Sequence, residues 1–396
     1  MKVVQINAVY GGGSTGRTTK ELSETLTQDG IENLIISTSD SSCENHVKVG
    51  SGFENKLHAL FARIFGYDSH YSCLSTKKII KTLAKYQPDV VHLRNLHANY
   101  VNLKKLLKYL AKNDIATVIT LHDCWFFTGK CTHYTAEGCY KWQTGCNNCS
   151  KLKSDIPSLY FDRTNKLYNE KKNGFLSIPR LAVVGVSDWI TNEAKKSFLK
   201  DAKIVKRIYN WIDLDVFYPR AVEKVGDKFT ILCIGAGWRE KSSKLKDLIK
   251  LACLLPKDME IWLAGSVSEG LELPSNVKKL GYISSTDELA KLYSKVDVYV
   301  HLSKEDTFGK VIAEALACGT PSIVYNSTAC PEVIGNGCGY VLESGHVENI
   351  VDKLNEIKNN KKESYSKNCV EFTKQNFEKK KLINENIEVY NELLKG

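Results

Sequence analysis

Short runs rich in Val and Ile alternate with amphipathic helical patterns, and this alternation constrains the fold more than any other feature. Such runs, bounded by turn residues and separated by helices, predict a parallel sheet covered by helices on both faces. The first half of the chain predicts strands at 2–8, 33–38, 89–94, 116–122, 181–187 and 203–210. We therefore expect a doubly wound α/β unit there.

The same pattern restarts after the polar segment 211–228, which we interpret as an interdomain linker. Further strands are predicted at 229–237, 259–265, 277–283, 296–303 and 321–325. A chain of 396 residues suits two domains. Ligands of open α/β sheets bind at the carboxyl ends of strands. We expect two Rossmann-like domains facing across a cleft. Their expected extents are 1–212 with a Cys-rich loop at 124–150, 213–375, and a helix at 376–396 that packs back on the N-terminal domain.

Composition narrows the class of protein. No run approaches the roughly 20 apolar residues of a membrane span, and the N-terminus "MKVVQINAVYGGG" lacks signal-peptide anatomy. We therefore expect a cytoplasmic protein. The net charge of +10 suits anionic ligands or simply a Lys-rich surface. Without an Arg-rich tract or a recognition motif, we expect no nucleic-acid partner.

A glycine loop, "YGGGSTGR", joins the first predicted strand to a helix. Gly11, Gly13 and Gly16 fit G-x-G-x-x-G, and Asp40 lies beyond the second strand. Glycines let backbone N–H groups approach a phosphate at a helix N-terminus, although a purely structural turn uses them too. Taken alone, this motif suggests an NAD(P)-dependent oxidoreductase.

A second motif, "HLSKEDTFGKVIAEALACGTPSIVY" (301–325), places two carboxylates around a helix start. Asp306 lies in the loop, Phe308 and Gly309 enter the helix, and Glu314 lies almost two turns inside it. The helix N-terminus suits a diphosphate, while Glu314 suits ribose hydroxyls and Asp306 suits the sugar. This arrangement predicts a nucleotide-sugar site; the alternative is an ordinary amphipathic helix with acids facing solvent.

The stretch "EDTFGKVIAEALACGTPSIV" resembles the signature of the retaining glycosyltransferases of family 4, which have a GT-B fold. Asp306 stands where the family has its first glutamate, and Glu314 matches the second. Segments 11–17, 92–110 and 120–131 are similar to capsule and exopolysaccharide members, and 208–219 resembles the family's interdomain loop with Trp211 in place of glycine.

The resemblance implies transfer of a hexose from a UDP- or GDP-sugar to a glycan acceptor, expected to be lipid-linked, in capsule, exopolysaccharide or O-antigen synthesis. No cofactor is implied for catalysis, and the departing phosphate would assist deprotonation of the acceptor. A non-catalytic nucleotide-sugar or glycan-binding protein is the remaining alternative. The Lys-rich amphipathic segments 75–86 and 100–113 could contact the inner face of the cell membrane or pack on the sheet.

The resemblance also assigns residues to the donor. It gives Gly12 and Gly13 to the donor-side loop. It gives Arg239 and Lys244 to the diphosphate, with Lys241 as a rival for Lys244. His122 ends a predicted strand and matches a histidine that lies beside the donor sugar and pyrophosphate, which implies a catalytic or donor-orienting role. The neighbouring Asp123 could orient His122, cap the next segment or approach the acceptor.

Four cysteines follow His122 closely, namely Cys131, Cys139, Cys146 and Cys149. The final C-x-x-C is a good zinc half-site, and four thiolates would close a structural site. His133 could replace one thiolate. Reduced buried thiols and disulfides are the other interpretations, although a reducing compartment disfavours disulfides. A catalytic zinc is not expected, because four thiolates leave no open position for substrate.

Overall fold

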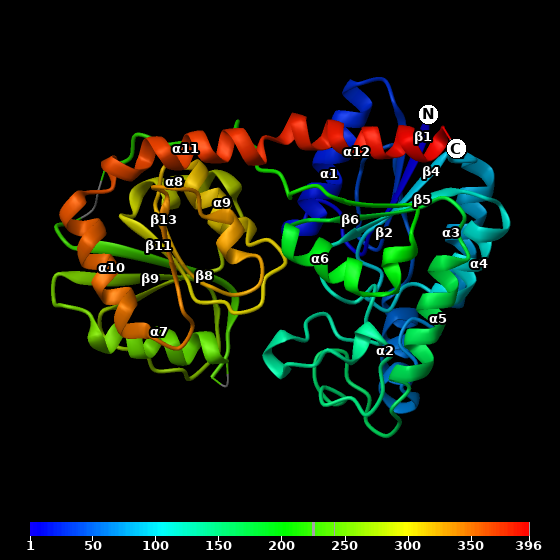
Figure 1. Ribbon diagram of the computed structural model, residues 1–396, viewed down its shortest axis with the longest axis horizontal. Helices are drawn as coiled ribbons and strands as arrows, with labels where there is room; N and C mark the ends of the chain where they lie inside the picture. The colour runs from blue at the N-terminus through cyan, green and yellow to red at the C-terminus, as the bar shows by residue number, and fades with distance from the viewer. Residues whose placement is uncertain (224–225, 241, 396) are drawn as a thin grey trace. The chain divides into compact units, whose positions relative to one another are not determined.

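The computed structural model describes residues 1–223, 226–240 and 242–395. The chain forms two compact units. Unit 1 comprises Met1–Ile208 and Leu382–Gly396, and unit 2 comprises Tyr209–Lys381. In each unit, helices flank a parallel sheet (Figure 1).

The sheet of unit 1 has seven strands in the order β3-β2-β1-β4-β5-β6-β7, and every pair is parallel. The strands are β1 (Lys2–Ile6), β2 (Glu32–Ser37), β3 (His46–Lys48), β4 (Val90–Leu93), β5 (Ala116–Leu121), β6 (Leu181–Gly185) and β7 (Ile204–Arg207). Strands β4, β5 and β6 are buried along their whole length. This burial is why their sequence is continuously apolar rather than alternating.

The helices of unit 1 connect these strands. They are α1 (Gly13–Gln28), α2 (Gly52–Phe65), α3 (Cys73–Tyr86), α4 (Leu103–Lys112), α5 (Thr164–Leu176) and α6 (Asp188–Lys196), with short 3-10 turns η1 (Thr135–Glu137), η2 (Lys141–Gln143) and η3 (Phe198–Asp201). Strand order reverses between β1 and β4, so right-handed crossovers place α1 and α4 on opposite faces. The loops after β1 and β4 diverge at this point, where doubly wound sheets bind ligands.

The C-terminal helix α12 (Lys379–Leu394) completes unit 1 from Leu382 onward. Its Tyr390 hydroxyl lies 2.7 Å from Nδ1 of His92 in β4, and the other ring nitrogen of His92 lies 2.6 Å from Oγ1 of Thr120 in β5. Burial lowers the pKa of His92 well below its ordinary value. This neutral, doubly bonded histidine joins the last helix to the middle of the sheet.

The sheet of unit 2 has six parallel strands in the order β10-β9-β8-β11-β12-β13. The strands are β8 (Phe229–Trp238), β9 (Met259–Val267), β10 (Val277–Gly281), β11 (Val298–His301), β12 (Ser322–Tyr325) and β13 (Gly339–Leu342). The other elements are α7 (Ser243–Leu254), α8 (Thr286–Lys295), α9 (Lys310–Ala317), η4 (Cys330–Val333), α10 (Val347–Asn360) and α11 (Glu363–Phe377). The strand order reverses between β8 and β11.

The segment predicted as a polar linker, 211–228, is in part a packed element of unit 2. Trp211, Ile212 and Phe217 are buried, and the backbone N–H of Ile212 donates to the carbonyl of Phe377 (2.8 Å). The linker interpretation is therefore wrong for this first part, because its apolar side chains are buried within unit 2 and Phe217 packs against Tyr293 of α8 (6.3 Å between ring centroids). Lys224 and Val225 lie outside the described residues.

Helix α9 begins later than the sequence pattern predicts. Phe308 and Gly309 precede the helix, and Gly309 occupies its N-cap position with a φ of +82°. A Cβ on Gly309 would lie 2.6 Å from Cδ1 of Ile312, so both space and backbone conformation favour glycine there. Glu314 is consequently little more than one turn inside the helix, not almost two. No helix within the described residues has the length and apolarity required to span a bilayer.

Candidate active site

The glycine loop of unit 1 lies on the surface at the carboxyl end of β1. Gly11, Gly12 and Gly13 are exposed, and Gly12 is the N-cap of α1 with no side-chain cap. The loop closes through a hydrogen bond from the N–H of Gly11 to the carbonyl of Gly16 (3.0 Å). The first-turn N–H groups of α1 therefore begin at an open surface, as a phosphate-binding loop requires.

The side chain of Asn7 fixes the backbone around this loop. The Asn7 amide donates to the carbonyls of Val9 and Thr15, and its Oδ1 accepts from the N–H of Asn95 after β4 (3.1 Å). Asp40 instead pairs with Lys48 on the exposed surface (2.6 Å). The carboxylate that the oxidoreductase alternative needs for a ribose is thus engaged in an ion pair.

His122 and Asp123 follow directly after β5, and the structure adds His97 from the loop after β4. Nε2–H of His97 donates to Oδ2 of Asp123 (2.8 Å), while the N–H of Trp125 donates to Oδ1 (2.8 Å). Asp123 thus orients His97 and caps the next segment. His122 lies near His92 and lowers the pKa of that imidazole further.

Burial and pairing oppose each other in the titration of this pair. Burial alone would lower the pKa of His97, but the hydrogen bond and charge of Asp123 outweigh it and raise the pKa. Burial likewise opposes ionisation of Asp123, but His97 and the Trp125 N–H hold the Asp123 pKa below its usual range. The pair therefore favours the doubly ionised form.

We expect this ion pair to make stability depend on pH. The His97 contribution is complete below its unfolded pKa of about 6.5 and is lost as pH rises through the raised folded value. The Asp123 contribution is present above about pH 3.9 and is lost as pH falls through the lowered folded value. Urea unfolding of wild type and His97→Gln should therefore show a larger stability difference at about pH 5.5 than at about pH 8.5. A pH-independent difference would contradict this account.

Two ionisable side chains, Asp68 and Lys171, contact the indole ring of Trp125. Oδ2 of Asp68 accepts from the indole N–H (2.9 Å), and Nζ of Lys171 lies 3.5 Å from the centroid of the ring. Lys171 also donates to the carbonyls of Trp125 (2.6 Å) and Thr128 (3.1 Å). Full burial lowers the pKa of Lys171 to about 7. The segment after Asp123 is therefore fixed by buried polar contacts.

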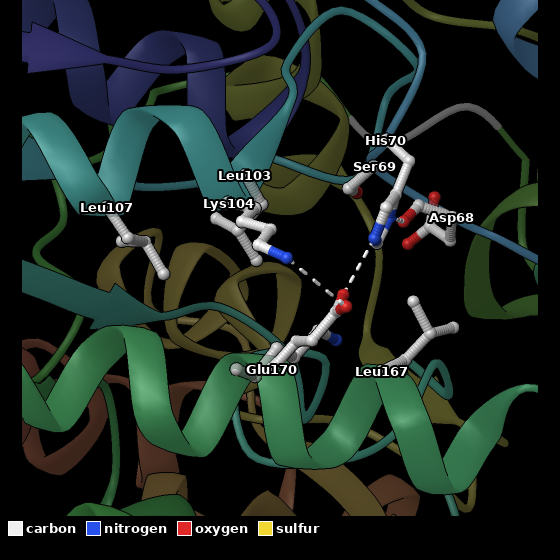
Figure 2. Close-up of a pocket in the computed structure, with 9 residues that line it drawn as sticks. Asp68, Ser69, His70, Leu103, Lys104, Leu107, Leu167 and Glu170 are labelled. Carbon is white, nitrogen blue, oxygen red and sulfur yellow. Dashed lines mark hydrogen bonds and ion pairs between the residues drawn. The ribbon is translucent and has the colours of Figure 1, made fainter.

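A small pocket opens beside these side chains, lined by Asp68 and Lys171 among others. Figure 2 shows His70 and Lys104 both directed toward Glu170, from the loop before α3 and from α4. Nε2 of His70 lies 2.7 Å from Oε2 of Glu170. These bonds tie α5 to the rest of unit 1 and occupy the polar groups at the pocket mouth.

In unit 2, Asp306 ends a chain of hydrogen bonds that starts in β11. Nε2–H of His301 donates to Oδ2 of Asp306 (2.8 Å), and Nδ1 accepts from the hydroxyl of Tyr299 (2.8 Å). The buried thiol of Cys330 also lies close, with its ligand atom within 4.8 Å of those of His301 and Asp306. The N–H of Asp306 donates to Oγ1 of Thr328 (3.0 Å). Asp306 is therefore held at both its backbone and its side chain.

Lys244 and Arg239 lie on the same side of the sheet, after β8. Nζ of Lys244 stacks over the Trp238 ring (4.8 Å), directly beside Gly235, where a Cβ would lie 2.8 Å from it. Burial lowers the pKa of Lys244, the charge of Asp306 raises it and the charge of Arg239 lowers it. Lys244 therefore lies within the electrostatic reach of both Asp306 and Arg239 at the carboxyl ends of β8 and β11. Lys241, the rival, lies outside the described residues.

Phe308 and Glu314 are both buried in unit 2. Phe308 packs against Tyr209 and Phe377 and is 1% exposed. Glu314 is 0% exposed, and its carboxylate accepts from the hydroxyl of Tyr293 (3.4 Å). The side chain of Phe308 is thus part of the core of unit 2, and a ribose contact by Glu314 stays a prediction.

Several residues of these networks were not singled out from the sequence. In unit 1 they are His97, Asp68 and Lys171; in unit 2 they are Tyr299 and His301. Only His301 carried a readable signal, because it ends an apolar strand five residues before Asp306. The others meet their partners through tertiary contacts alone.

Two doubly wound Rossmann-like units, the second with cations and a carboxylate at its strand ends, define a glycosyltransferase of the GT-B class. Residues 11–216 match the model of glycosyltransferase family 4, and residues 217–376 match that of glycosyl transferases group 1. The chain therefore belongs to glycosyltransferase family 4, as the sequence resemblance predicted.

Curated relatives agree with this assignment. The chain is 26% identical over 273 residues to a putative colanic acid biosynthesis glycosyl transferase, WcaC, of Escherichia coli; the match covers 67% of this chain but only 66% of that protein. It is 24% identical to N-acetyl-alpha-D-glucosaminyl L-malate synthase of Bacillus anthracis, over 88% of this chain and 89% of that one.

Solved structures confirm the fold class. A sucrose-phosphate synthase from Thermosynechococcus elongatus aligns with a TM-score of 0.73 at 16% identity, covering 99% of both chains. Anabaena HepE, solved in complex with UDP and glucose, aligns with a TM-score of 0.65 at 16% identity, covering 99% of this chain and 100% of that one. At these identities the likeness concerns the fold alone.

Proposed function

We propose that this chain is a retaining hexosyltransferase that moves a sugar from a nucleotide diphosphate donor to a glycan acceptor in extracellular polysaccharide or O-antigen synthesis. One observation carries the proposal. In the group 1 domain, Lys244 interacts electrostatically with both Asp306 and Arg239 at the strand ends where doubly wound sheets bind ligands. The colanic acid relative supports the polysaccharide assignment.

Unit 2 would bind the donor. Lys244 and Arg239 supply positive charge for the diphosphate, which gains negative charge as it departs. The N-terminus of α9 adds a partial positive charge beside Asp306. Asp306, fixed by His301, would accept hydrogen bonds from the transferred sugar. HepE has been solved with UDP and with UDP-glucose, which favours a UDP-sugar as the first donor to test.

The reaction exchanges one bond at the anomeric carbon. The bond from C1 to the β-phosphate oxygen breaks, and a bond from C1 to the acceptor hydroxyl oxygen forms on the same face. The acceptor proton passes to the departing diphosphate, so no protein nucleophile and no metal ion are needed. The work of the protein is positioning and charge stabilisation.

Unit 1 would hold the acceptor and orient the reacting sugar. His122 and the His97–Asp123 pair lie at adjacent strand ends, β5 and β4. Imidazole and carboxylate groups recognise sugar hydroxyls through directed hydrogen bonds. The exposed N–H groups near Gly12 and Gly13 would add anion binding at the start of α1.

A lipid-linked acceptor requires contact with a membrane, and the exposed apolar side chains of unit 1 support one. We define the α2 patch as the exposed side chains of α2 and the loop after Ser158, namely Phe53, Leu60, Phe61, Phe65, Leu159, Tyr160 and Phe161. The two segments adjoin, since the N–H of Leu159 donates to the carbonyl of Arg63 (2.7 Å). Arg163 lies 5.1 Å from the Phe161 ring, so a cationic side chain adjoins the patch. The leucines of α4, by contrast, are buried in unit 1.

We expect Phe61→Ser/Phe65→Ser to weaken binding to anionic liposomes at least about tenfold, because burying one Phe side chain contributes about 1.5–3 kcal/mol. Cosedimentation with liposomes of mixed neutral and anionic lipid measures this. Leu254→Ser, which changes an exposed leucine of unit 2, is the matched control and should bind as wild type. Equal binding by all three proteins would remove the membrane assignment.

A donor panel tests the proposed activity. Purified protein is screened by thermal shift against UDP-, GDP- and ADP-sugars and NADH, because a ligand that binds only the folded state raises apparent stability. We expect one class of nucleotide sugar to stabilise the protein and to release its nucleoside diphosphate slowly by hydrolysis. Stabilisation by NADH alone would revive the oxidoreductase alternative. Donor binding without turnover of any donor, with acceptor glycans supplied, would favour a binding protein.

A further inference from the structure

The connection between β5 and α5, residues 122–163, contains only the two 3-10 turns η1 and η2 as regular structure. Connections of this length without helices or strands are uncommon unless something else holds them. An aromatic cluster holds part of this loop: Trp142 packs against Phe127 (4.9 Å between ring centroids) and Tyr134 (5.0 Å). This small cluster leaves the outer part of the loop to be fixed by other means.

The four cysteines of this loop gather around a single small cavity. Cys131, Cys139, Cys146 and Cys149 all line it, although they come from three separate turns of the loop. Trp142 lines it too, and its buried indole N–H has no hydrogen-bond acceptor among the described residues. His133, which could have replaced a thiolate, does not line the cavity.

A hydrogen bond already directs a donor at one of the sulfur atoms. The N–H of Gly129 donates to Sγ of Cys146 (3.2 Å). A backbone N–H aimed at a cysteine sulfur stabilises negative charge on it, as a metal-bound thiolate requires.

Cations surround the same cavity. Lys130 and Lys141 line it, and both are anchored to the loop backbone: Lys130 donates to the carbonyl of Leu152 (2.6 Å), and Lys141 to that of Asn148 (2.9 Å). A zinc ion with four thiolates carries a net charge of about −2, from the +2 ion and four −1 ligands. Two lysines at the rim offset that charge.

We propose that Cys131, Cys139, Cys146 and Cys149 bind one structural zinc ion in a tetrahedral tetrathiolate site. Each thiol that binds releases its proton to solvent. Among the described residues, no three of these sulfurs lie within 4.8 Å of one another. Tetrahedral coordination with Zn–S bonds of about 2.3 Å would therefore draw the three turns together around the ion.

The zinc site would support the candidate active site through the segment between them. Oγ1 of Thr128 donates to the carbonyl of Cys131 (2.6 Å), and the N–H of Gly129 donates to Sγ of Cys146. The ammonium group of Lys171 donates to the carbonyls of Trp125 and Thr128, and the N–H of Trp125 donates to Oδ1 of Asp123. The ion would thus act at a distance, by fixing the backbone that follows Asp123.

Metal analysis of the full chain, purified without added metal, tests the proposal. We expect about one zinc ion per chain in wild type and in the matched control Cys43→Ser/Cys73→Ser, whose cysteines are exposed and outside the loop. Cys146→Ser/Cys149→Ser should lose the zinc. Because metal content is measured without substrate, its outcome is independent of whether the proposed transferase activity is found.

If the double variant does not fold, removal and return of zinc in the wild-type protein test the proposal. Removing zinc with a chelator should lower the unfolding temperature, and zinc but not magnesium should restore it. Cobalt in place of zinc should give the thiolate charge-transfer absorption of a tetrahedral site. Zinc well below one equivalent, together with four freely reactive thiols or with disulfides by intact mass, would overturn the proposal.

Discussion

Replacing Lys244 with alanine is expected to lower the rate of sugar transfer about 10²–10³-fold, the usual cost of removing one group that stabilises transition-state charge. Its ammonium group is half-buried between the Trp238 ring and Gly235 and interacts with Asp306. A cation held in this way needs little reorganisation when the diphosphate departs. The loss should therefore appear in kcat at least as much as in KM.

The matched control is Lys250→Ala on the same helix, α7. Lys250 forms an exposed pair with Glu348, and such pairs contribute about 0–1 kcal/mol to stability. Steady-state kinetics of both variants, with circular dichroism to verify folding, measure the difference. A Lys244→Ala enzyme with wild-type kinetics would contradict the assignment, and the same loss in Lys241→Ala instead would transfer the role to Lys241.

Replacing His122 with alanine is the second large effect, again about 10²–10³-fold in kcat. His122 follows β5 directly, on a backbone fixed by Asp123, Trp125 and the buried Lys171. We assign it to a hydrogen bond with the reacting sugar that strengthens as charge develops at the anomeric carbon. Binding of the free nucleoside diphosphate should then be unchanged, because that ligand lacks the sugar.

His346→Ala, an exposed histidine beside Glu348, is the control for this variant and should keep full activity. Turnover and calorimetric binding of the nucleoside diphosphate are measured together. If His122→Ala lost nucleotide binding in proportion to turnover, or lost neither, the sugar-orienting role would be wrong.

Most strands of both sheets were predictable because buried parallel strands are continuously apolar. The run predicted at 229–237 is β8 (Phe229–Trp238), and the run at 116–122 is β5 (Ala116–Leu121). Two edge strands escaped prediction, β3 (His46–Lys48) and β13 (Gly339–Leu342). Each is an edge strand that is only partly buried and very short: β3 has three residues with one apolar side chain, and β13 has four residues that begin with a glycine.

The candidate site was predictable only where its functional side chains lie close together in the sequence. Asp306 and Glu314 could be read as one motif because eight positions separate them. His97 and Asp123 are 26 positions apart. Their pairing depends on the register of β4 with β5, where Val91 lies opposite Thr117, and on the shape of the loop after β4. Such a pair has no sequence signature.

Local backbone conformation accounts for the error at α9. The pattern from Thr307 onward is helical in period, but Gly309 adopts a left-handed conformation that ends the loop and starts the helix at Lys310. Glycine is neutral in a periodicity argument, so its role as an N-cap was invisible. This N-cap sets the position of Glu314 relative to Asp306, the two carboxylates of the predicted donor site.

Product analysis of a complete reaction tests the central claim most directly. Purified protein is incubated with the nucleotide sugar selected by thermal shift and a glycan acceptor, and the new linkage is assigned by proton NMR. We predict one nucleoside diphosphate released per sugar transferred, with the anomeric configuration of the donor retained. Inversion at the anomeric carbon, or no release of diphosphate from any nucleotide sugar, would contradict this prediction.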